Sequence, residues 1–185
     1  MILSVHQPNF FPWLPYFKKI QESDVFVILG NVQFARRQFQ NRFFYKDRWN
    51  TMSVNSGLQS DLIVDKSYLK PIEDWTKIKR GLNEDNLNKF DSHIGHNLYQ
   101  TNVSIIYSLL RELNISTPIL EDSHIQNLNA SERIIKLCKE NGADTYLTGP
   151  SGKKYLDISL FQHYGISIQD FNYGEDEAIS VLELL

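Results

Sequence analysis

A histidine, His6, stands where a short apolar run gives way to polar residues. Residues 2–5 (ILSV) precede it, and residues 7–9 (QPN) follow it. This pattern predicts a buried strand that opens into a loop. In open parallel α/β sheets, ligands bind at the edge where the strands end. An imidazole at that edge could act as a general base near neutral pH, so His6 is the candidate catalytic residue, with Gln7 and Asn9 as candidate ligand contacts.

A second segment, residues 35–46 (ARRQFQNRFFYK), places cations between aromatic rings. It follows a predicted strand at residues 25–29, and Gln33 lies just before it. Guanidinium groups bind phosphate oxygens through paired hydrogen bonds, and aromatic rings stack on bases. The segment therefore predicts a phosphate-bearing ligand with a planar ring, although a strand with outward arginines and buried rings also fits. The candidate phosphate ligands are Arg36, Arg37, Arg42 and Lys46.

A third segment, residues 148–155 (TGPSGKKY), lies between a predicted strand and a helical pattern. Backbone N–H groups at a helix N-terminus bind anions, so Gly149, Ser151 and Gly152 are candidate ligand contacts. The spacing is that of neither a P-loop nor a dinucleotide fingerprint, and an ordinary tight turn fits equally well. Because loops that follow parallel strands leave the same edge of a sheet, we expect the three segments to meet in one cleft.

Alternating strands and helices must position these segments. Predicted strands cover residues 2–5, 25–29, 49–54, 62–64, 117–120 (with Ile125), 146–148 and 166–171. Predicted helices cover residues 13–21, 72–87, 103–113, 129–141 and 178–185, with a further helical pattern after residue 152. Asn129 and Glu132 have the spacing of a capping box. The pattern predicts an α/β fold, with a mostly parallel sheet flanked by helices in Rossmann-like layers. We expect a single domain over residues 1–185 with a helical insertion at about residues 72–114.

Composition narrows the class of protein. The chain has 185 residues, of which 42% are hydrophobic and 22% are charged, as in a soluble globular domain. A net charge of −3 argues against a general nucleic-acid binder. The single cysteine, Cys138, lies in a helical pattern and is expected in the core, which fits a reducing compartment. With no signal-peptide pattern and no long apolar run, we expect a cytoplasmic protein without a membrane partner.

Several other chemistries find no support in the sequence. Residues 93–96 spell HIGH, a signature of class I aminoacyl-tRNA synthetases, but they follow a polar segment instead of the first strand. His93, His96 and the distant His124 lack the spacing of a metal site. The carboxylates are dispersed, and no serine elbow is present. We therefore expect neither a metal nor a cofactor.

Three ordered motifs, HQPNFFPWLPYFKKI, DVFVILGNVQFARRQFQNR and GADTYLTGPSGKKYLD, resemble the WbqC-like family of bacterial polysaccharide gene clusters. The resemblance implies glycyl or other acyl transfer to an amino sugar in O-antigen and related surface-polysaccharide biosynthesis. It also implies that AISVLELL begins a C-terminal helix, which family members often extend. Its motif positions add Gln40, Asn41 and Tyr155 to the candidate ligand contacts.

The leading hypothesis is a transferase that attaches an acyl group to a nucleotide-linked amino sugar. His6 would deprotonate the amine, the cations would hold the diphosphate, and the N–H groups of Ser151 and Gly152 would stabilise the oxyanion. The acyl donor could be a small molecule, a carrier-protein thioester or an aminoacyl-tRNA. The alternatives are a nucleotidyltransferase-like enzyme, a non-catalytic module that binds a sugar nucleotide or a carrier protein, and a single-stranded nucleic-acid binder. The sequence does not indicate the oligomeric state.

Overall fold

The computed structural model describes residues 1–57, 61–123, 128–150, 152–174 and 179–185. The chain forms two compact units, each assembled from segments that are distant in the sequence. Unit 1 comprises Met1–His6, Pro15–Leu29 and Ile115–Glu177, and unit 2 comprises Gln7–Leu14, Gly30–Asn114 and Ala178–Leu185. That the chain acts as a single domain stays a prediction. The helices of the expected insertion at residues 72–114 belong to unit 2.

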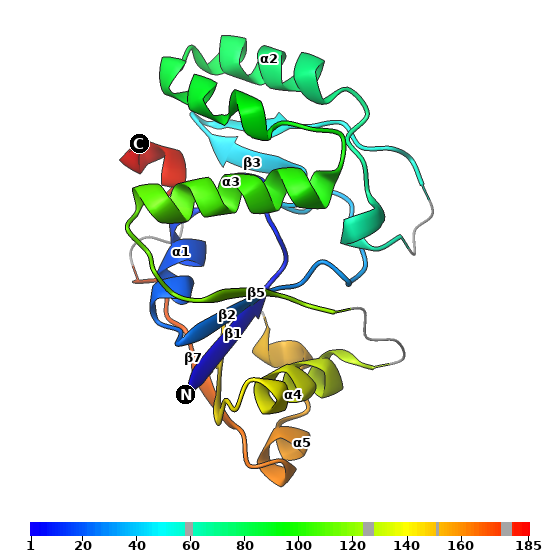
Figure 1. Cartoon of the computed structure of the whole chain (residues 1–185), viewed down its shortest axis with the longest axis vertical. Coiled ribbons are helices and arrows are strands. Elements are labelled where there is room, and N and C mark those ends of the chain that lie inside the picture. Colours follow the sequence, from blue (N-terminus) through cyan, green and yellow to red (C-terminus); the bar gives the residue numbers. More distant parts are fainter. Residues whose placement is uncertain (58–60, 124–127, 151, 175–178) are drawn as a thin grey trace. The chain divides into compact units, whose positions relative to one another are not determined.

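Unit 1 contains a five-stranded sheet in the order β5-β2-β1-β6-β7, and every neighbouring pair is parallel (Figure 1). The strands are β1 (Ile2–His6), β2 (Val25–Ile28), β5 (Ile119–Glu121), β6 (Thr145–Thr148) and β7 (Ser167–Asp170). All four residues of β2 are buried, as the short apolar run of the sequence predicts. The predicted α/β class with a parallel sheet is confirmed.

Helices cover both faces of this sheet. They are α1 (Leu14–Gln21), α4 (Ala130–Glu140) and α5 (Ile158–His163). The short 3₁₀ helix η3 (Lys153–Tyr155) precedes α5 and has no buried residue. Leu3 and Val5 of β1 pack with Cys138 of α4 and Phe161 of α5 on one face. On the other face, the ring of Tyr16 in α1 contacts that of Phe26. These contacts bury the central strands β2, β1 and β6 on both faces, as is usual for parallel sheets, whereas the edge strands β5 and β7 are largely exposed.

Unit 2 contains an antiparallel hairpin of β3 (Arg42–Tyr45) and β4 (Arg48–Thr51), with α2 (Pro71–Leu82) and α3 (Leu98–Glu112). Its described residues also form the 3₁₀ helices η1 (Ile63–Asp65), η2 (Asp85–His93) and η5 (Val181–Leu184). Its core is aromatic. Phe11, from the segment after β1, stacks on Trp75 of α2 at a ring distance of 5.4 Å and contacts Phe43 of β3 and Phe90 of η2. The sequence-distant parts of unit 2 are thus joined by buried rings.

Four details of the predicted elements were wrong. Residues 35–46, expected as a loop, contain β3, and the strand expected at residues 62–64 is replaced by η1. The helix from residue 72 ends at Leu82, because Asn83 adopts a left-handed conformation with φ 52° and closes it. In place of the helix predicted at residues 178–185, the structure has the short 3₁₀ helix η5. His124 and Ile125, which were also considered in the sequence, lie outside the described residues. In apolar runs of only a few residues, the periodicity of hydrophobic residues does not distinguish a strand from a helical turn.

Candidate functional site

His6 ends β1 at the carboxyl edge of the sheet in unit 1, where the sequence places it. Its ring meets that of Tyr16 edge-on, with centroids 4.9 Å apart, and its side chain is partly buried. Strand β1 pairs with β6 from Ile2 opposite Thr145 to Ser4 opposite Leu147. Extended by two residues, this register sets His6 level with Gly149. The imidazole and the glycine turn therefore follow adjacent strands at one edge.

The turn after β6 is compact, and its polar groups are largely used within it. The N–H of Gly152 donates to the carbonyl of Gly149 at 3.0 Å, which engages a group expected to hold an oxyanion. A Cβ at Gly149 would lie 2.8 Å from the hydroxyl of Tyr173, and one at Gly152 would lie 2.5 Å from that of Thr148. The glycines thus permit a close approach of neighbouring side chains. Only the three-residue 3₁₀ helix η3 follows, so no α-helix N-terminus is presented here; Ser151 lies outside the described residues.

The predicted ligand contacts Gln7 and Gln40 belong to a polar network in unit 2. The amide of Gln40 donates to Oε1 of Gln7. Asn102 of α3 is fully buried, and its amide donates to the carbonyls of Pro8 at 2.8 Å and Gln40 at 2.6 Å. Burial raises the pKa of Tyr68, whose protonated hydroxyl donates to Oδ1 of Asn102 at 2.7 Å. The network fixes the segment after β1 against the turn that precedes β3.

Two more predicted contacts, Asn9 and Asn41, are also buried, with exposed fractions of 4% and 8%. The amide of Asn41 donates to the carbonyl of Met52 at 2.7 Å. Burial of this kind is typical of residues that hold a fold together. Asn41 has a second role, however, because it also lines a pocket of unit 2.

This pocket has a volume of about 280 Å³ and gathers three cations, Arg36, Arg37 and Lys66. Its other lining residues are Phe34, Asn41, Val54, Asn55 and Ser56. Nη2 of Arg36 donates to the carbonyl of Ser56 at 3.1 Å. Among the described residues, neither Arg36 nor Arg37 forms an ion pair with a carboxylate. A pocket with two guanidinium groups that lack a carboxylate partner is suited to an anion.

The backbone of Arg37 has a φ of 62°, in the left-handed region that residues with a side chain rarely adopt. Its carbonyl accepts a hydrogen bond from Nη2 of Arg42, which fixes this conformation. Such unfavourable backbone conformations persist where the surrounding structure enforces them, and they are concentrated at binding sites. Arg42 therefore positions Arg37 at the pocket.

Lys66 was not among the residues predicted from the sequence. Its side chain is 5% exposed, forms an ion pair with Asp61 at 2.7 Å and lies 5.5 Å from the ring centre of Phe34. It follows η1 in a segment without a recognisable motif, so only the fold brings it to the arginines. No local pattern would have revealed it.

The remaining predicted contacts lie outside this pocket. Lys46 is in the turn of the hairpin and pairs with Glu84 at 2.5 Å, and this hydrogen bond raises the pKa of Lys46. Gln33 is exposed and forms an isolated bridge with Leu62. Tyr155 of η3 is 78% exposed. Of the four predicted phosphate ligands, the pocket thus gathers Arg36 and Arg37, while Arg42 supports Arg37 and Lys46 is bound to Glu84.

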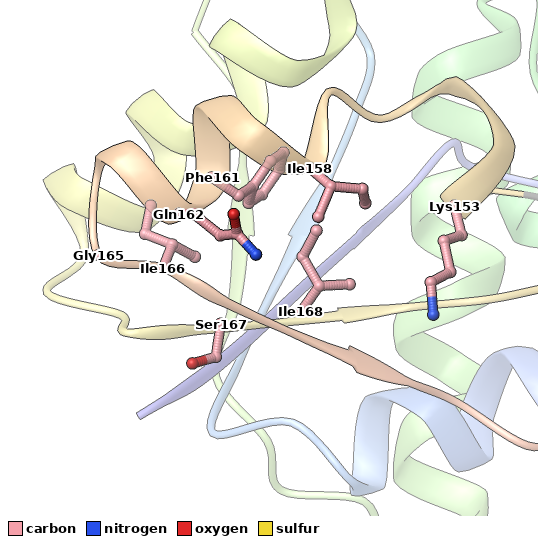
Figure 2. A pocket seen from close by; sticks show the side chains of 8 residues that line it. All are labelled: Lys153, Ile158, Phe161, Gln162, Gly165, Ile166, Ser167 and Ile168. Carbon is pink, nitrogen blue, oxygen red and sulfur yellow. The ribbon is translucent and has the colours of Figure 1, made fainter.

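A larger pocket of about 540 Å³ lies in unit 1 between α5 and β7 (Figure 2). Figure 2 shows the aliphatic side chains of Ile158, Ile166 and Ile168 around it. Lys153, the one charged residue among its described lining residues, forms an ion pair with Asp170 at 2.7 Å. Among the described residues, none of those predicted from the sequence lines this pocket.

The other titratable groups show no sign of a second centre. Across the part of the chain that the structure describes, no three His, Cys, Asp or Glu side chains come together as metal ligands. Cys138 is fully buried, as predicted, and burial raises the pKa of its thiol to about 12. His93 contacts the hydroxyl of Ser104, and burial lowers its pKa. No helix within the described ranges is long and apolar enough to cross a membrane.

Comparisons with known proteins place the chain in a family. It is 24% identical to an uncharacterised protein of Mycobacterium tuberculosis in an alignment that covers 99% of this chain and 92% of that protein. No solved structure matches the chain. The sequence profile of the WbqC-like protein family matches residues 7–177, which include the three motifs noted in the sequence from Gln7 onward. The chain belongs to the WbqC-like protein family.

Proposed function

We propose that the protein is a cytoplasmic transferase of bacterial surface-polysaccharide biosynthesis that acts on a nucleotide-linked amino sugar. The observation that carries the proposal is the pocket of unit 2, where Arg36, Arg37 and Lys66 converge. Its volume of about 280 Å³ is at the small end for ligand pockets, so it suits the diphosphate of a ligand rather than the entire molecule. Family membership is consistent with this role.

In the proposed reaction, His6 accepts a proton from the sugar amine as the amine nitrogen bonds to the acyl carbon of the donor. The imidazolium then returns the proton to the leaving group, which departs with the electron pair of the broken acyl bond. An acyl donor such as a glycyl ester or thioester fits this scheme. His6 is suited to the role because it lies at the carboxyl edge of a parallel sheet with its ring held against Tyr16.

The binding part of the proposal is tested by titration calorimetry with pyrophosphate and UDP. Replacement of both arginines, Arg36→Ala with Arg37→Ala, removes charge-assisted hydrogen bonds and should weaken both ligands by about tenfold or more. A matched control is Lys136→Ala, since Lys136 is a half-exposed cation on α4 in unit 1. Equal affinities of wild type and the double variant for pyrophosphate would exclude the pocket as the anion site.

The catalytic part is tested with His6→Ala. This variant should lose acyl transfer to a nucleotide-linked amino sugar but retain UDP affinity within about threefold, because the pocket residues are unchanged. Transfer at the wild-type rate would eliminate His6 as the base.

A second candidate, a non-catalytic module that binds a sugar nucleotide, is favoured by one observation. The pocket is lined by cations, amides, a hydroxyl and apolar groups, without an imidazole, carboxylate or thiol among its described lining residues. Such a pocket can bind an anion without transforming it. Tight UDP binding by wild type, combined with an absence of transfer from glycyl and acyl donors, would support this function over the transferase.

A further inference from the structure

The outward face of the β3–β4 hairpin in unit 2 is aromatic although it is exposed. Side chains alternate between the two faces of a strand pair, so Phe43 and Asn50 face inward and are buried, at 2% and 1% exposure. Their neighbours Phe44 and Trp49 face outward, opposite each other, with 48% and 45% of their surfaces exposed. Exposed apolar surface of this kind is characteristic of a binding site.

The two exposed rings belong to a continuous series of ring contacts that extends to half-buried rings outside the hairpin. Phe44 and Trp49 have ring centres 5.5 Å apart, and Trp49 and Phe39 have theirs 5.6 Å apart. Phe39 in turn stacks on Trp13, with an interplanar angle of 23°. The contacts hold the rings in fixed orientations, so a ligand that stacks on them would not have to order them first.

This surface is joined to the cationic pocket by one guanidinium group. The Arg42 Cζ lies 4.1 Å from the centre of the Trp49 ring, and its Nη2 donates to the carbonyl of Arg37, which lines the pocket. The Nε of Arg42 is buried without a hydrogen-bond partner among the described residues. A planar cation stacked on a ring is itself a surface on which a second planar group can stack.

We propose that Phe44, Trp49 and Arg42 bind the nucleobase of the ligand whose diphosphate occupies the pocket of Arg36, Arg37 and Lys66. The inference rests on the proposed function, because it takes the pocket as the diphosphate site. A nucleobase fits better than a sugar ring, since the paired outward residues of the two strands are Arg42, Phe44, Trp49 and Thr51. These offer planar groups and a single hydroxyl, whereas a sugar ring needs amide or carboxylate partners for its many hydroxyl groups.

The test compares ligands with and without a base. UDP and ADP should each be titrated against pyrophosphate, and a hexose 1-phosphate serves as the sugar control. At least one nucleoside diphosphate should bind about tenfold more tightly than pyrophosphate, because stacking of a base on an aromatic residue has an effect of this size. Trp49→Ala should abolish this advantage and leave pyrophosphate affinity unchanged, whereas Trp49→Phe should retain most of it.

Tryptophan fluorescence gives an independent readout, because the chain has three tryptophans and Trp75 is buried. The nucleotide should quench the emission of wild type, and Trp49→Phe should lose that quenching while it still binds. Equal affinity for pyrophosphate and both nucleotides overturns the base site but preserves the anion pocket. A Trp49-dependent gain for the hexose phosphate alone overturns the nucleobase assignment. Loss of pyrophosphate binding in Trp49→Ala, with normal binding in Phe44→Ser, would show a structural role for the ring and also overturn it.

Discussion

Lys19 of α1 is buried in unit 1 with an exposed fraction of 6%, and its ammonium group donates to the carbonyl of Val5 at 2.9 Å. It has no ion pair with a carboxylate among the described residues. Burial without a counter-charge disfavours the protonated form and lowers the pKa of Lys19 to about 8. A cation therefore lies immediately beside the backbone that ends at His6.

Replacing this lysine should stabilise the protein in a pH-dependent way. Between pH 8 and 10.5 the unfolded chain keeps the proton on Lys19 and the folded chain loses it, so wild-type stability gains from rising pH in this window. At pH 7 the desolvation cost is fully present, and Lys19→Met should raise the free energy of unfolding by up to about 3 kcal/mol, less the lost hydrogen bond to Val5. The advantage should shrink toward about pH 10.

Urea unfolding of wild type and Lys19→Met across this pH range measures the difference directly. The two proteins must be compared at each pH because Cys138 makes both less stable at high pH. Burial raises the pKa of this thiol to about 12, so the thiol ionises more readily in the unfolded chain. Lys136→Met, at the half-exposed site on α4, provides a control for the removal of a lysine that is not buried. A constant difference between wild type and Lys19→Met would contradict the assignment.

Single residues were predictable from sequence where a pattern fixes their surroundings. Cys138 lies within the periodic apolar stripe of a helix, and its burial follows from that stripe. His6 is placed by the apolar strand that it ends. Lys19 and Lys66 were not predictable, because a lysine usually points to solvent and only tertiary packing encloses these two.

At the scale of elements, α3 fixes two loops of unit 2 through Asn102. The residue makes three buried hydrogen bonds, to the carbonyls of Pro8 and Gln40 and to the hydroxyl of Tyr68. Asn102→Ala should lower the free energy of unfolding by about 2–4 kcal/mol, because it removes these bonds and leaves buried polar groups unsatisfied. Chemical denaturation measures the loss.

Asn102→Ala also tests whether the buried network supports ligand binding as well as folding. Tyr68→Phe removes the hydroxyl that donates to Asn102 and Gln40 and should cost less than Asn102→Ala, about 1–2 kcal/mol. If α3 positions the turn before β3, Asn102→Ala should also weaken pyrophosphate binding when assayed below its unfolding temperature. A loss of stability below about 0.5 kcal/mol would mean that the buried network contributes little.

A helix or strand could be predicted where the residues that begin or end it form a recognisable local pattern. The capping box of Asn129 and Glu132 is present as predicted and begins α4. The β3–β4 hairpin was missed because its turn is Lys46-Asp47, with φ of 51° and 55°, where Asn-Gly is the usual signal. The pair of Lys46 with Glu84 near the end of α2 accompanies this unfavourable turn, and no local pattern announces such a contact.

At the scale of the whole chain, the parallel sheet was predictable because strands alternate with helices along the sequence. The assembly of each unit from separated segments was not, since hydrophobic periodicity reports only on neighbours in sequence. The predicted site divides accordingly. His6 and the glycine turn belong to unit 1, whereas Gln7, Asn9 and the basic segment belong to unit 2. The meeting of all three segments in one cleft stays a prediction.

The net charge of the chain favours a single nucleotide over a polynucleotide as the ligand. The chain carries a net charge of −3. Of the three cations of the pocket, Lys66 alone forms an ion pair within the described part of the chain, with Asp61. A long polyanion extends over the negatively charged surface of the protein and is repelled by it. A single nucleotide is small enough to contact the cations of the pocket alone. Single-stranded oligouridylate should therefore fail to displace a fluorescent UDP analogue, and UDP affinity should fall only a few-fold between about 50 and 200 mM salt. Displacement by the oligonucleotide, with an affinity that falls by about a thousandfold over that range, would instead identify a nucleic-acid binder.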